Sequence, residues 1–363
     1  MQLAAQWVRF MGSYPIMPNL IAVAGLSWIC FSIAHNLDIS SNRSNGTIVE
    51  MVRVVSGSTY LVDKAISLRV AYHNIFSEEV RIIISNLFIN WALWIVVPFI
   101  MFLELLFPCH STQPLVGKSF IQDSIWYVVN IFMNLLILFP LINFLRSLFE
   151  HHAGFLIIDS AISWPIYLRI TVALLISEFI RWFNHFIRHK VHGLWEFHAV
   201  HHSQKEINVF TDDRGHLVDQ LISSLLDFVP FIILQVSNAY AMSIIFLYRP
   251  IHNRFVHANV KINLGWLGFV FSSPQFHRVH HSSDPEHADK NFGVLFSFFD
   301  YIFGTAASSR FVYPETGIND TRFPTEDKVG LLHLPKNLGL QMLYPFRKLF
   351  ERKPSASELS QDD

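Results

Sequence analysis

Long apolar segments alternate with polar ones along the chain, and this pattern predicts helices that cross a membrane. A helix needs about 20 apolar residues to span the hydrocarbon core of a bilayer. Apolar segments of that order or longer cover, within a few residues, 16–34, 82–107, 120–148, 164–186 and 217–247. We therefore predict an all-α fold, a multi-pass membrane helical bundle.

Some of these segments contain residues that interrupt a simple span. Pro140 lies within the third segment, where it predicts a kink or a re-entrant break. The last segment contains Pro230 and is either one long bent helix or a hairpin of two helices. Charged residues at membrane depth are costly and usually functional, and the fourth segment carries Arg169, Glu178 and Arg181.

The polar regions 185–216 and 252–287 hold 13 of the 19 histidines. They are too polar for hydrocarbon, so we expect helices at the membrane surface there. Both are rich in Lys and Arg, which favours the cytosolic side, but the loop 36–79 also carries basic residues and leaves the topology open. No Gly/Ser linker divides the chain, and we expect one domain over residues 1–363 with a disordered tail at 351–363.

The composition supports a membrane protein and excludes other classes. Hydrophobic residues make up 52% of the chain and charged residues 15%, whereas soluble domains carry about 25% charged residues. A formal net charge of −1 gives no reason to expect a nucleic-acid partner. The two cysteines, Cys30 and Cys109, offer neither a disulfide framework nor a thiolate metal site.

Eight histidines stand in three tight groups: His185-x3-His189, His198-x2-His201-His202 and His277-x2-His280-His281. Residues three and four apart lie on one face of a helix, so each group presents its imidazoles in one direction. Imidazole is the commonest metal ligand among side chains. The repeated His-x2-His-His element predicts two similar half-sites, and hence a dinuclear metal centre.

The ligand types indicate which metal such a centre holds. Zinc usually takes four ligands, so eight histidines are too many for one zinc ion. The zinc-protease motif His-Glu-x-x-His and a Gly-rich phosphate loop are both absent from the sequence. Two iron ions with imidazole ligands suit dioxygen activation, because coordination positions can stay open. The electrons then have to come from a separate protein.

Glu178, His185 and His189 lie on one stripe of the fourth helix. Glu178 is therefore a candidate catalytic or metal-orienting carboxylate, and the alternative is an ion pair with Arg181 one turn further on. His192 continues the same stripe three residues after His189 and is either a ligand or a surface histidine.

These motifs resemble the fatty acid hydroxylase, or sterol desaturase, superfamily of membrane di-iron oxygenases. The resemblance covers residues 178–305, which we interpret as the catalytic region. Trp195 followed by His198-Ala199-Val200-His201-His202-Ser203 is similar to the family's Trp-x-x-His-x-x-His-His-Ser. The family's closing signature is matched by Pro274, His277-Arg278-Val279-His280-His281, Asn291-Phe292-Gly293, Asp300 and Phe303-Gly304-Thr305.

Further site residues are assigned by the resemblance. His257 is similar to the isolated histidine that the family places between its second and third groups, which implies a ligand. Arg214-x-His216 resembles the sterol-modifying branches, and His216 is either an extra ligand or a cap of the next helix. His252 is open in the same way. Glu178 resembles the family's acidic residue ahead of the first histidine pair.

The resemblance implies a membrane-bound di-iron oxygenase with the histidine-rich helical cap on the cytosolic side of the endoplasmic reticulum or a bacterial inner membrane. Such an enzyme hydroxylates or desaturates an unactivated C–H bond of a sterol, fatty acyl or alkylglycerol lipid. It uses O2 and electrons from a cytochrome- or ferredoxin-type protein with its reductase. The implied ligands of the two irons are His185, His189, His198, His201, His202, His216, His257, His277, His280 and His281.

The subfamily, and so the lipid, stays open. The closing segment resembles the alkylglycerol monooxygenases, whereas Trp182, Phe183 and Phe186 depart from the family's usual residues around the first histidine. The alternative function is a histidine-rich membrane metal transporter, or a metal-binding protein without oxygenase activity.

Overall fold

The protein is described here by a computed structural model that covers residues 92–236, 249 and 251–351. The chain divides into two compact units, residues 1–94 and 95–363, and the description concerns the second. The apolar segment predicted at 16–34, most of the one at 82–107 and nearly all of the tail lie outside the described residues. The predictions of one domain and a disordered tail therefore stay predictions.

Every regular element in the described residues is helical, and only isolated backbone bridges join extended residues there. The all-α prediction is confirmed for this part of the chain. The first element is α6 (Val97–Leu106), which follows a π-helical turn at Ala92–Val96.

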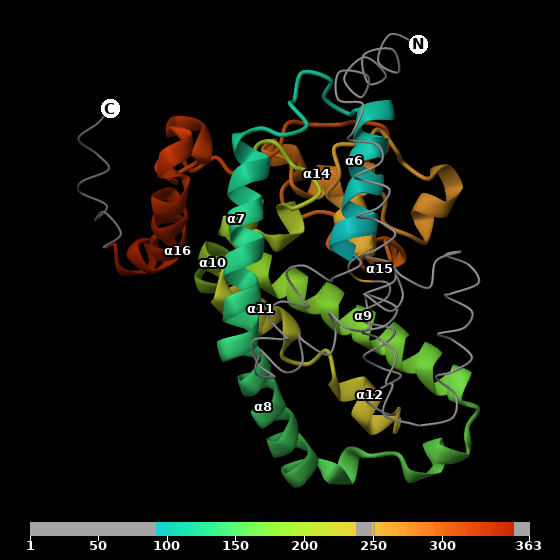
Figure 1. The fold of residues 1–363 in the computed structure, drawn as a ribbon. Helices are drawn as coiled ribbons and strands as arrows, with labels where there is room; N and C mark the ends of the chain where they lie inside the picture. Colours follow the sequence, from blue (N-terminus) through green and yellow to red (C-terminus); the bar gives the residue numbers. More distant parts are fainter. Residues whose placement is uncertain (1–91, 237–248, 250, 352–363) are drawn as a thin grey trace, which may run out of the picture. The chain divides into compact units, whose positions relative to one another are not determined.

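A long continuous helix dominates one side of the unit (Figure 1). It consists of α7 (Lys118–Met133), the π-helical η3 (Asn134–Leu138) and α8 (Phe139–His152). In the described residues it is the one helix long and apolar enough to cross a membrane by length and composition. Only 6% of its most apolar stretch is buried, as expected for a helix that faces lipid.

The re-entrant break predicted at Pro140 is wrong, because the helix runs through this residue. Proline lacks an N–H and its ring clashes with the carbonyl four residues back. The π-helical turn that directly precedes α8 shifts this pairing, and the N–H of Phe139 bonds the carbonyl of Asn134, five residues back. Pro140 then takes one of the first positions of α8, where a proline is tolerated.

The fourth predicted segment becomes α9 (Ile166–Lys190), which in Figure 1 rises diagonally to α10 (His192–His202). Between the two helices Val191 is extended, with φ −98° and ψ 110°. His192 therefore begins a new helix, and the expectation that it continues the stripe of His189 is wrong. In the described part of the predicted last segment, residues 217–236, lie the short helices α11 (Leu217–Ser224) and α12 (Val229–Ile233).

Three further helices frame the histidine regions. They are α14 (Pro274–His280), α15 (Phe298–Phe303) and α16 (Leu334–Phe350). Short 3-10 turns occupy Gly154–Leu156, Asp159–Ser163, Thr211–Asp213, Gly265–Phe269, Pro285–His287, Glu326–Lys328 and Leu331–His333.

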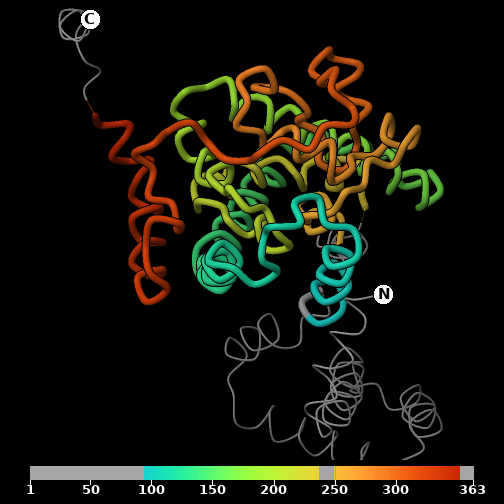
Figure 2. Tube along the Cα trace, turned by 90° about the horizontal axis from the view of Figure 1, so that it is seen from above, coloured from blue at the N-terminus to red at the C-terminus, as the bar shows by residue number. Residues whose placement is uncertain are grey.

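The core that positions the site joins α7, α10 and α16. Figure 2 views α7 nearly along its axis, with α16 beside it. Trp126 is fully buried against Val200 of α10 and Leu338 of α16, and its indole N–H donates to Gln341 over 2.8 Å. This packing fixes α10, the helix that carries three of the predicted ligands.

Candidate metal centre

The structure gathers nine histidines into two groups, in each of which the candidate ligand atoms lie within 4.8 Å of one another. The first group contains His185, His189, His198, His202 and His280, and the second contains His201, His257, His277 and His281. Nine of the ten predicted ligands are therefore brought together, although they come from segments nearly 100 residues apart.

Each His-x2-His-His element contributes to both groups. On α10, the pair His198 and His202 faces the first group, and the residue between them, His201, faces the second. Around α14 the assignment is reversed: His277 and His281 enter the second group and His280 enters the first. Residues four apart lie on one face of a helix, so the first and last histidine of each element enter the same group and the histidine between them enters the other.

The ring nitrogens converge more closely than ordinary packing requires. In the first group, the Nε2 atom of His198 lies 3.0 Å from that of His185 and 3.1 Å from that of His202. In the second, the Nε2 atom of His277 lies 2.9 Å from that of His257 and 3.1 Å from that of His281. One ring nitrogen takes part in a single in-plane hydrogen bond, so two such neighbours at once indicate a shared cation.

The opposite ring nitrogens are held by the protein. Backbone carbonyls of Phe292 and Lys290 each lie 2.7 Å from the Nδ1 atoms of His185 and His280, and that of Asn253 lies 2.7 Å from Nδ1 of His257. A carbonyl can only accept, so each Nδ1 carries the proton and each Nε2 keeps its lone pair for a metal.

Two further ring nitrogens have no hydrogen-bond partner among the described residues, which also favours a bound metal. The Nε2 atoms of His189 and His280 are buried and have no hydrogen-bond partner among the described residues. A buried polar atom without a partner is costly, and a bound cation would satisfy both. The residues present therefore fit two nitrogen-bound metal ions.

Burial keeps the imidazoles neutral. It lowers the pKa of His201 to about 3, with the neighbouring His257 as the next cause. Burial, then the nearby imidazoles, lower the pKa values of His202, His277 and His281 well below the ordinary value. Neutral imidazole is the form that binds metal, so this set is ready to bind at neutral pH.

One carboxylate supports the first group from behind. Asp219 of α11 accepts from Arg188 over 2.9 Å and lies 3.2 Å from the Nδ1 atom of His198. Burial opposes ionisation of Asp219, but Arg188 and His198 outweigh it and hold the pKa of that carboxyl below its ordinary range. The ionised carboxylate orients His198, as carboxylates commonly do for metal-binding histidines.

The comparisons with known proteins agree with this arrangement. Residues 170–305 match the fatty acid hydroxylase family. This segment contains both histidine groups in full. The resemblance inferred from the sequence is thus confirmed over the part of the chain that builds the site.

The names of curated relatives that match part of the chain describe enzymes that act on lipids. An ornithine lipid hydroxylase of Rhizobium tropici is 32% identical over 146 residues, which cover 39% of this chain and 43% of the relative. An alkylglycerol monooxygenase of Homo sapiens is 32% identical over 155 residues, 42% of this chain and 34% of the relative. The chain thus matches less than half the length of these relatives. No solved structure matches the chain.

The matched residues 170–305 also contain predicted site residues that lie outside the two histidine groups. Glu178 is 3% exposed and pairs with Arg181 over 3.0 Å, which is the alternative considered for it. His216 caps α11: its Nδ1 atom accepts from the N–H of Val218, and its Nε2 atom lies 3.1 Å from the carbonyl of Met342. We leave His216 out of the ligand set because both of its nitrogens have partners.

Two other histidines also lie apart. The ring of His252 lies 2.8 Å from the carbonyl of Val294. The His192 side chain is 64% exposed and lies 3.4 Å from Glu196. Neither belongs to a group of candidate ligands in the described residues.

Sequence reasoning did not foresee the role of Asp300, a member of the matched closing signature. Its carboxylate accepts from the indole of Trp182 and the hydroxyl of Thr305 over 3.1 and 2.6 Å. It also accepts from the N–H groups of Phe292 and Gly293 over 2.8 and 2.7 Å. Asp300 thereby fixes the loop whose Phe292 carbonyl orients His185.

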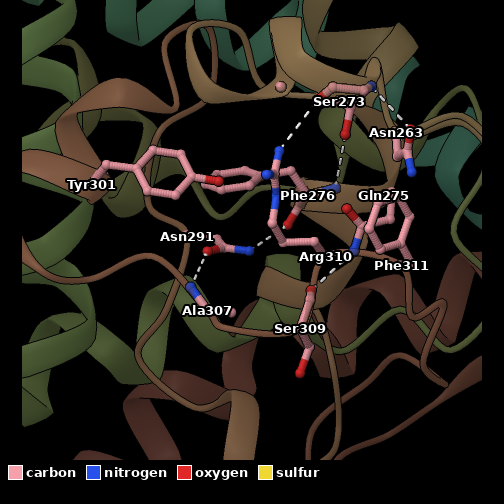
Figure 3. Close-up of a pocket in the computed structure, with 12 residues that line it drawn as sticks. Asn263, Ser273, Gln275, Phe276, Asn291, Tyr301, Ala307, Ser309, Arg310 and Phe311 are labelled. Atoms are coloured by element: carbon pink, nitrogen blue, oxygen red, sulfur yellow. Dashed lines mark hydrogen bonds between the residues drawn. The ribbon is translucent and has the colours of Figure 1, made fainter.

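A small pocket beside α14 shows how that helix is anchored (Figure 3). The side chain of Asn291 donates to the carbonyl of Phe276 over 2.9 Å and accepts from the N–H of Ala307 over 2.7 Å. Ser273 caps α14 by accepting from the N–H of Phe276. These bonds fix the start of the helix that carries His277 and His280.

A cavity of about 560 Å³ adjoins the metal centre. Five of the nine histidines line it, namely His185, His198, His201, His257 and His277. Its far wall comes from the long helix of α7 and α8, including Leu138, Phe139 and Ile142. This size suits a small ligand or one end of a lipid. A second pocket of about 370 Å³ reaches the first group by His189, His202 and His280.

Proposed function

We propose that the protein is a membrane-bound lipid oxygenase that holds one iron ion in each histidine group. The convergence of Nε2 atoms in two neighbouring groups carries this proposal. The family match and the lipid-directed relatives support it. The catalytic region is then residues 178–305, and the substrate is a sterol, fatty acyl or alkylglycerol type of lipid.

The number of ligands favours iron over zinc. Zinc usually takes four ligands, whereas the first group alone offers five histidines. The Nε2 separations between 2.9 and 3.2 Å are short enough for neighbouring imidazoles to bind one ion in each group. Bound iron would supply dioxygen activation at these positions.

The overall reaction balances with an external reductant. In a hydroxylation, one oxygen atom of O2 enters the C–H bond and the other leaves as water, with two electrons and two protons supplied from outside. In a desaturation, both oxygen atoms leave as water and the substrate loses two hydrogens. We propose a cytochrome- or ferredoxin-type protein with its reductase as the electron source.

The protein's own residues would bind the lipid and exclude water from the centre. Leu138, Phe139 and Ile142 present apolar surface on the cavity wall formed by the candidate membrane helix. A lipid chain would enter along this wall from the bilayer and place its reactive carbon near the histidines. Excluding water strengthens every electrostatic interaction at the centre.

We further propose a multi-pass arrangement with the histidine groups on the cytosolic side of the endoplasmic reticulum or a bacterial inner membrane. One helix that can cross a membrane by length and composition lies in the described residues, and apolar side chains of its second half, such as Leu136, Phe139 and Phe144, are exposed. The long apolar segments before residue 92 would provide further spans.

Replacing His280 with alanine tests the proposal. We expect His280→Ala to lose most of its iron and at least 90% of its activity (roughly a tenfold or greater loss). His280 of α14 completes a group whose other members lie on α9 and α10, so its loss would weaken the binding of that ion. His192→Ala is the matched control, since its side chain is 64% exposed.

The measurements are elemental analysis of the purified protein and mass spectrometry of lipids from expressing cells. Oxygenase activity adds one oxygen or removes two hydrogens from a lipid. Full turnover and retained iron in His280→Ala would refute the assignment. Metal transport into proteoliposomes without oxygen consumption would favour the alternative of a metal transporter.

A further inference from the structure

The arginines that line the 560 Å³ cavity are all paired with carboxylates, two of which, Asp219 and Asp227, line the cavity as well. Four arginines line it, and each has a carboxylate partner: Arg181 with Glu178, Arg188 with Asp219, Arg214 with Asp123, and Arg249 with Asp227, at distances from 2.6 to 3.0 Å. No lysine is among the described residues that line the cavity. An anionic group would therefore find no uncompensated positive charge there.

The one lining carboxylate without a cationic partner among the described residues is Asp212. Asp213 next to it pairs with Arg254 over 2.5 Å. Asp212 accepts a hydrogen bond only from the amide of Asn253, over 3.2 Å, and its side chain is 29% exposed. The balance of the wall is thus slightly negative beside the second histidine group.

The same wall carries buried acceptor atoms that lack donors. The Oδ1 atoms of Asn134, Asp227 and Asn253 have no hydrogen-bond partner among the described residues. All three residues line the cavity, and Asp227 is only 9% exposed. Buried acceptors without donors are uncommon, so hydroxyl or ammonium hydrogens of a ligand would complement these three atoms. On the same wall the Nε atom of Arg188 is a buried donor without a partner among the described residues.

The acceptors lie close to the metal centre. The carboxylate of Asp212 is 3.9 Å from the Nδ1 atom of His257, a member of the second group. His201 and His277 of the same group line the cavity as well. A polar head bound at Asp212 would therefore place the first carbons of its chain beside the histidines, with the rest of the chain toward α8.

We propose that the site oxidises a carbon next to the polar head of an amphiphile without net negative charge, and that Asp212 accepts hydrogen bonds from a hydroxyl or ammonium group of that head. This inference rests on the proposed function for its reaction, and on the cavity wall alone for its binding preference. Free fatty carboxylates and phosphate monoesters are excluded as preferred substrates, because the arginines are already paired.

Binding to the metal-free full-length protein in nanodiscs tests the preference independently of turnover. Three amphiphiles with the same saturated chain and a glyceryl ether, a primary amine or a phosphate as head would be titrated calorimetrically below their micelle concentrations. We expect the glyceryl ether and the amine to bind about tenfold or more tightly than the phosphate.

Two variants connect this preference to Asp212. Asp212→Lys should reverse the order, so that the phosphate binds more tightly than the amine. Asp212→Asn keeps an acceptor and should weaken the amine about tenfold while leaving the glyceryl ether nearly unchanged. Glu286→Lys is the matched control, because Glu286 is exposed and lies outside the cavity, and it should preserve the original order.

Product analysis separates the two proposals. With iron, O2 and a reductant, mass spectrometry should locate the new oxygen within the first carbons after the head. Equal binding of all three heads, or oxidation far along the chain, would overturn the inference while leaving the oxygenase intact. The expected binding order without any oxidised product would instead refute the proposed function and leave the head preference standing.

Discussion

At the scale of single residues, the site is built by fixing one nitrogen of several of the imidazoles so that the other is free. The carbonyls of Phe292, Lys290 and Asn253 hold the Nδ1 atoms of three candidate ligands. The histidine spacing in the sequence predicted which residues converge, because helical periodicity is local. It could not predict these carbonyl partners, since they lie on loops whose path depends on tertiary structure.

Asp219 provides a prediction at this scale. Asp219→Asn should weaken iron binding about 10- to 100-fold, because the amide cannot hold His198 and Arg188 as an ionised carboxylate does. Metal competition with a chelator measures the change. Asp327→Asn, which alters an exposed pair with Lys205, should leave iron affinity unchanged. Unchanged affinity in Asp219→Asn would show that the carboxylate has no part in orienting His198.

At the scale of elements, the loop between α14 and α15 fixes the first histidine group. Asp300 at the start of α15 binds the N–H groups of Phe292 and Gly293, and the Phe292 carbonyl then meets His185. Gly293 fits here because a Cβ atom would lie 2.2 Å from the carbonyl oxygen of Phe296 and 2.8 Å from the Asp300 carboxylate. Close approach of the backbone thus explains a glycine in the matched signature.

Gly293→Ala should therefore destabilise the protein by about 1–3 kcal/mol and reduce its iron content, because the loop has to move away from His185. Thermal unfolding and elemental analysis measure the two effects. Gly339→Ala is the control: it lies within α16, where an added Cβ meets nothing within 4 Å, and alanine favours the helix by about 1 kcal/mol. Iron retained at the wild-type level in Gly293→Ala would contradict this account of the loop.

The elements also show where sequence reasoning succeeds and fails. Apolar length predicted a helical segment over 120–148, but the re-entrant break expected at Pro140 was wrong, because nothing in the sequence indicates the π-helical turn that lets the helix pass the proline. The stripe from Glu178 to His189 exists on α9, whereas the extended Val191 ends it before His192. The backbone conformation of a single residue between two helices depends on how the helices pack, and the spacing of hydrophobic residues in the sequence does not indicate it.

At the scale of the whole molecule, the described unit buries nine neutral histidines between helices that come from distant parts of the chain. The sequence predicted that these histidines serve one dinuclear centre, and the structure brings nine of them together in two groups. The cavity, its paired arginines and the unpartnered acceptors of its wall could not be predicted, because they arise where α8, α11 and α9 meet. The proposed substrate preference thus depends on tertiary contacts rather than on the histidine motifs.

The buried histidines make the stability of the metal-free protein depend on pH. Burial lowers the pKa of His201 to about 3, while an unfolded histidine titrates near 6.5. Below about pH 6.5 the unfolded chain binds protons that the folded protein does not, so the stabilisation is complete above that pH and falls as pH decreases toward about 3. Each such histidine contributes about 1.4 kcal/mol per pH unit.

We therefore expect the metal-free protein in detergent to lose stability steeply between pH 6.5 and 5, as measured by its thermal midpoint. His281→Gln removes one of these buried imidazoles and should reduce the slope, whereas His192→Ala removes an exposed one and should not. The metal-loaded protein should release iron over the same range, because protons compete for the same nitrogens. A midpoint that rises as the pH falls would contradict this account, since groups that take up protons on folding, such as the Asp213 carboxyl with its pKa raised by burial to about 6, would then outweigh the histidines.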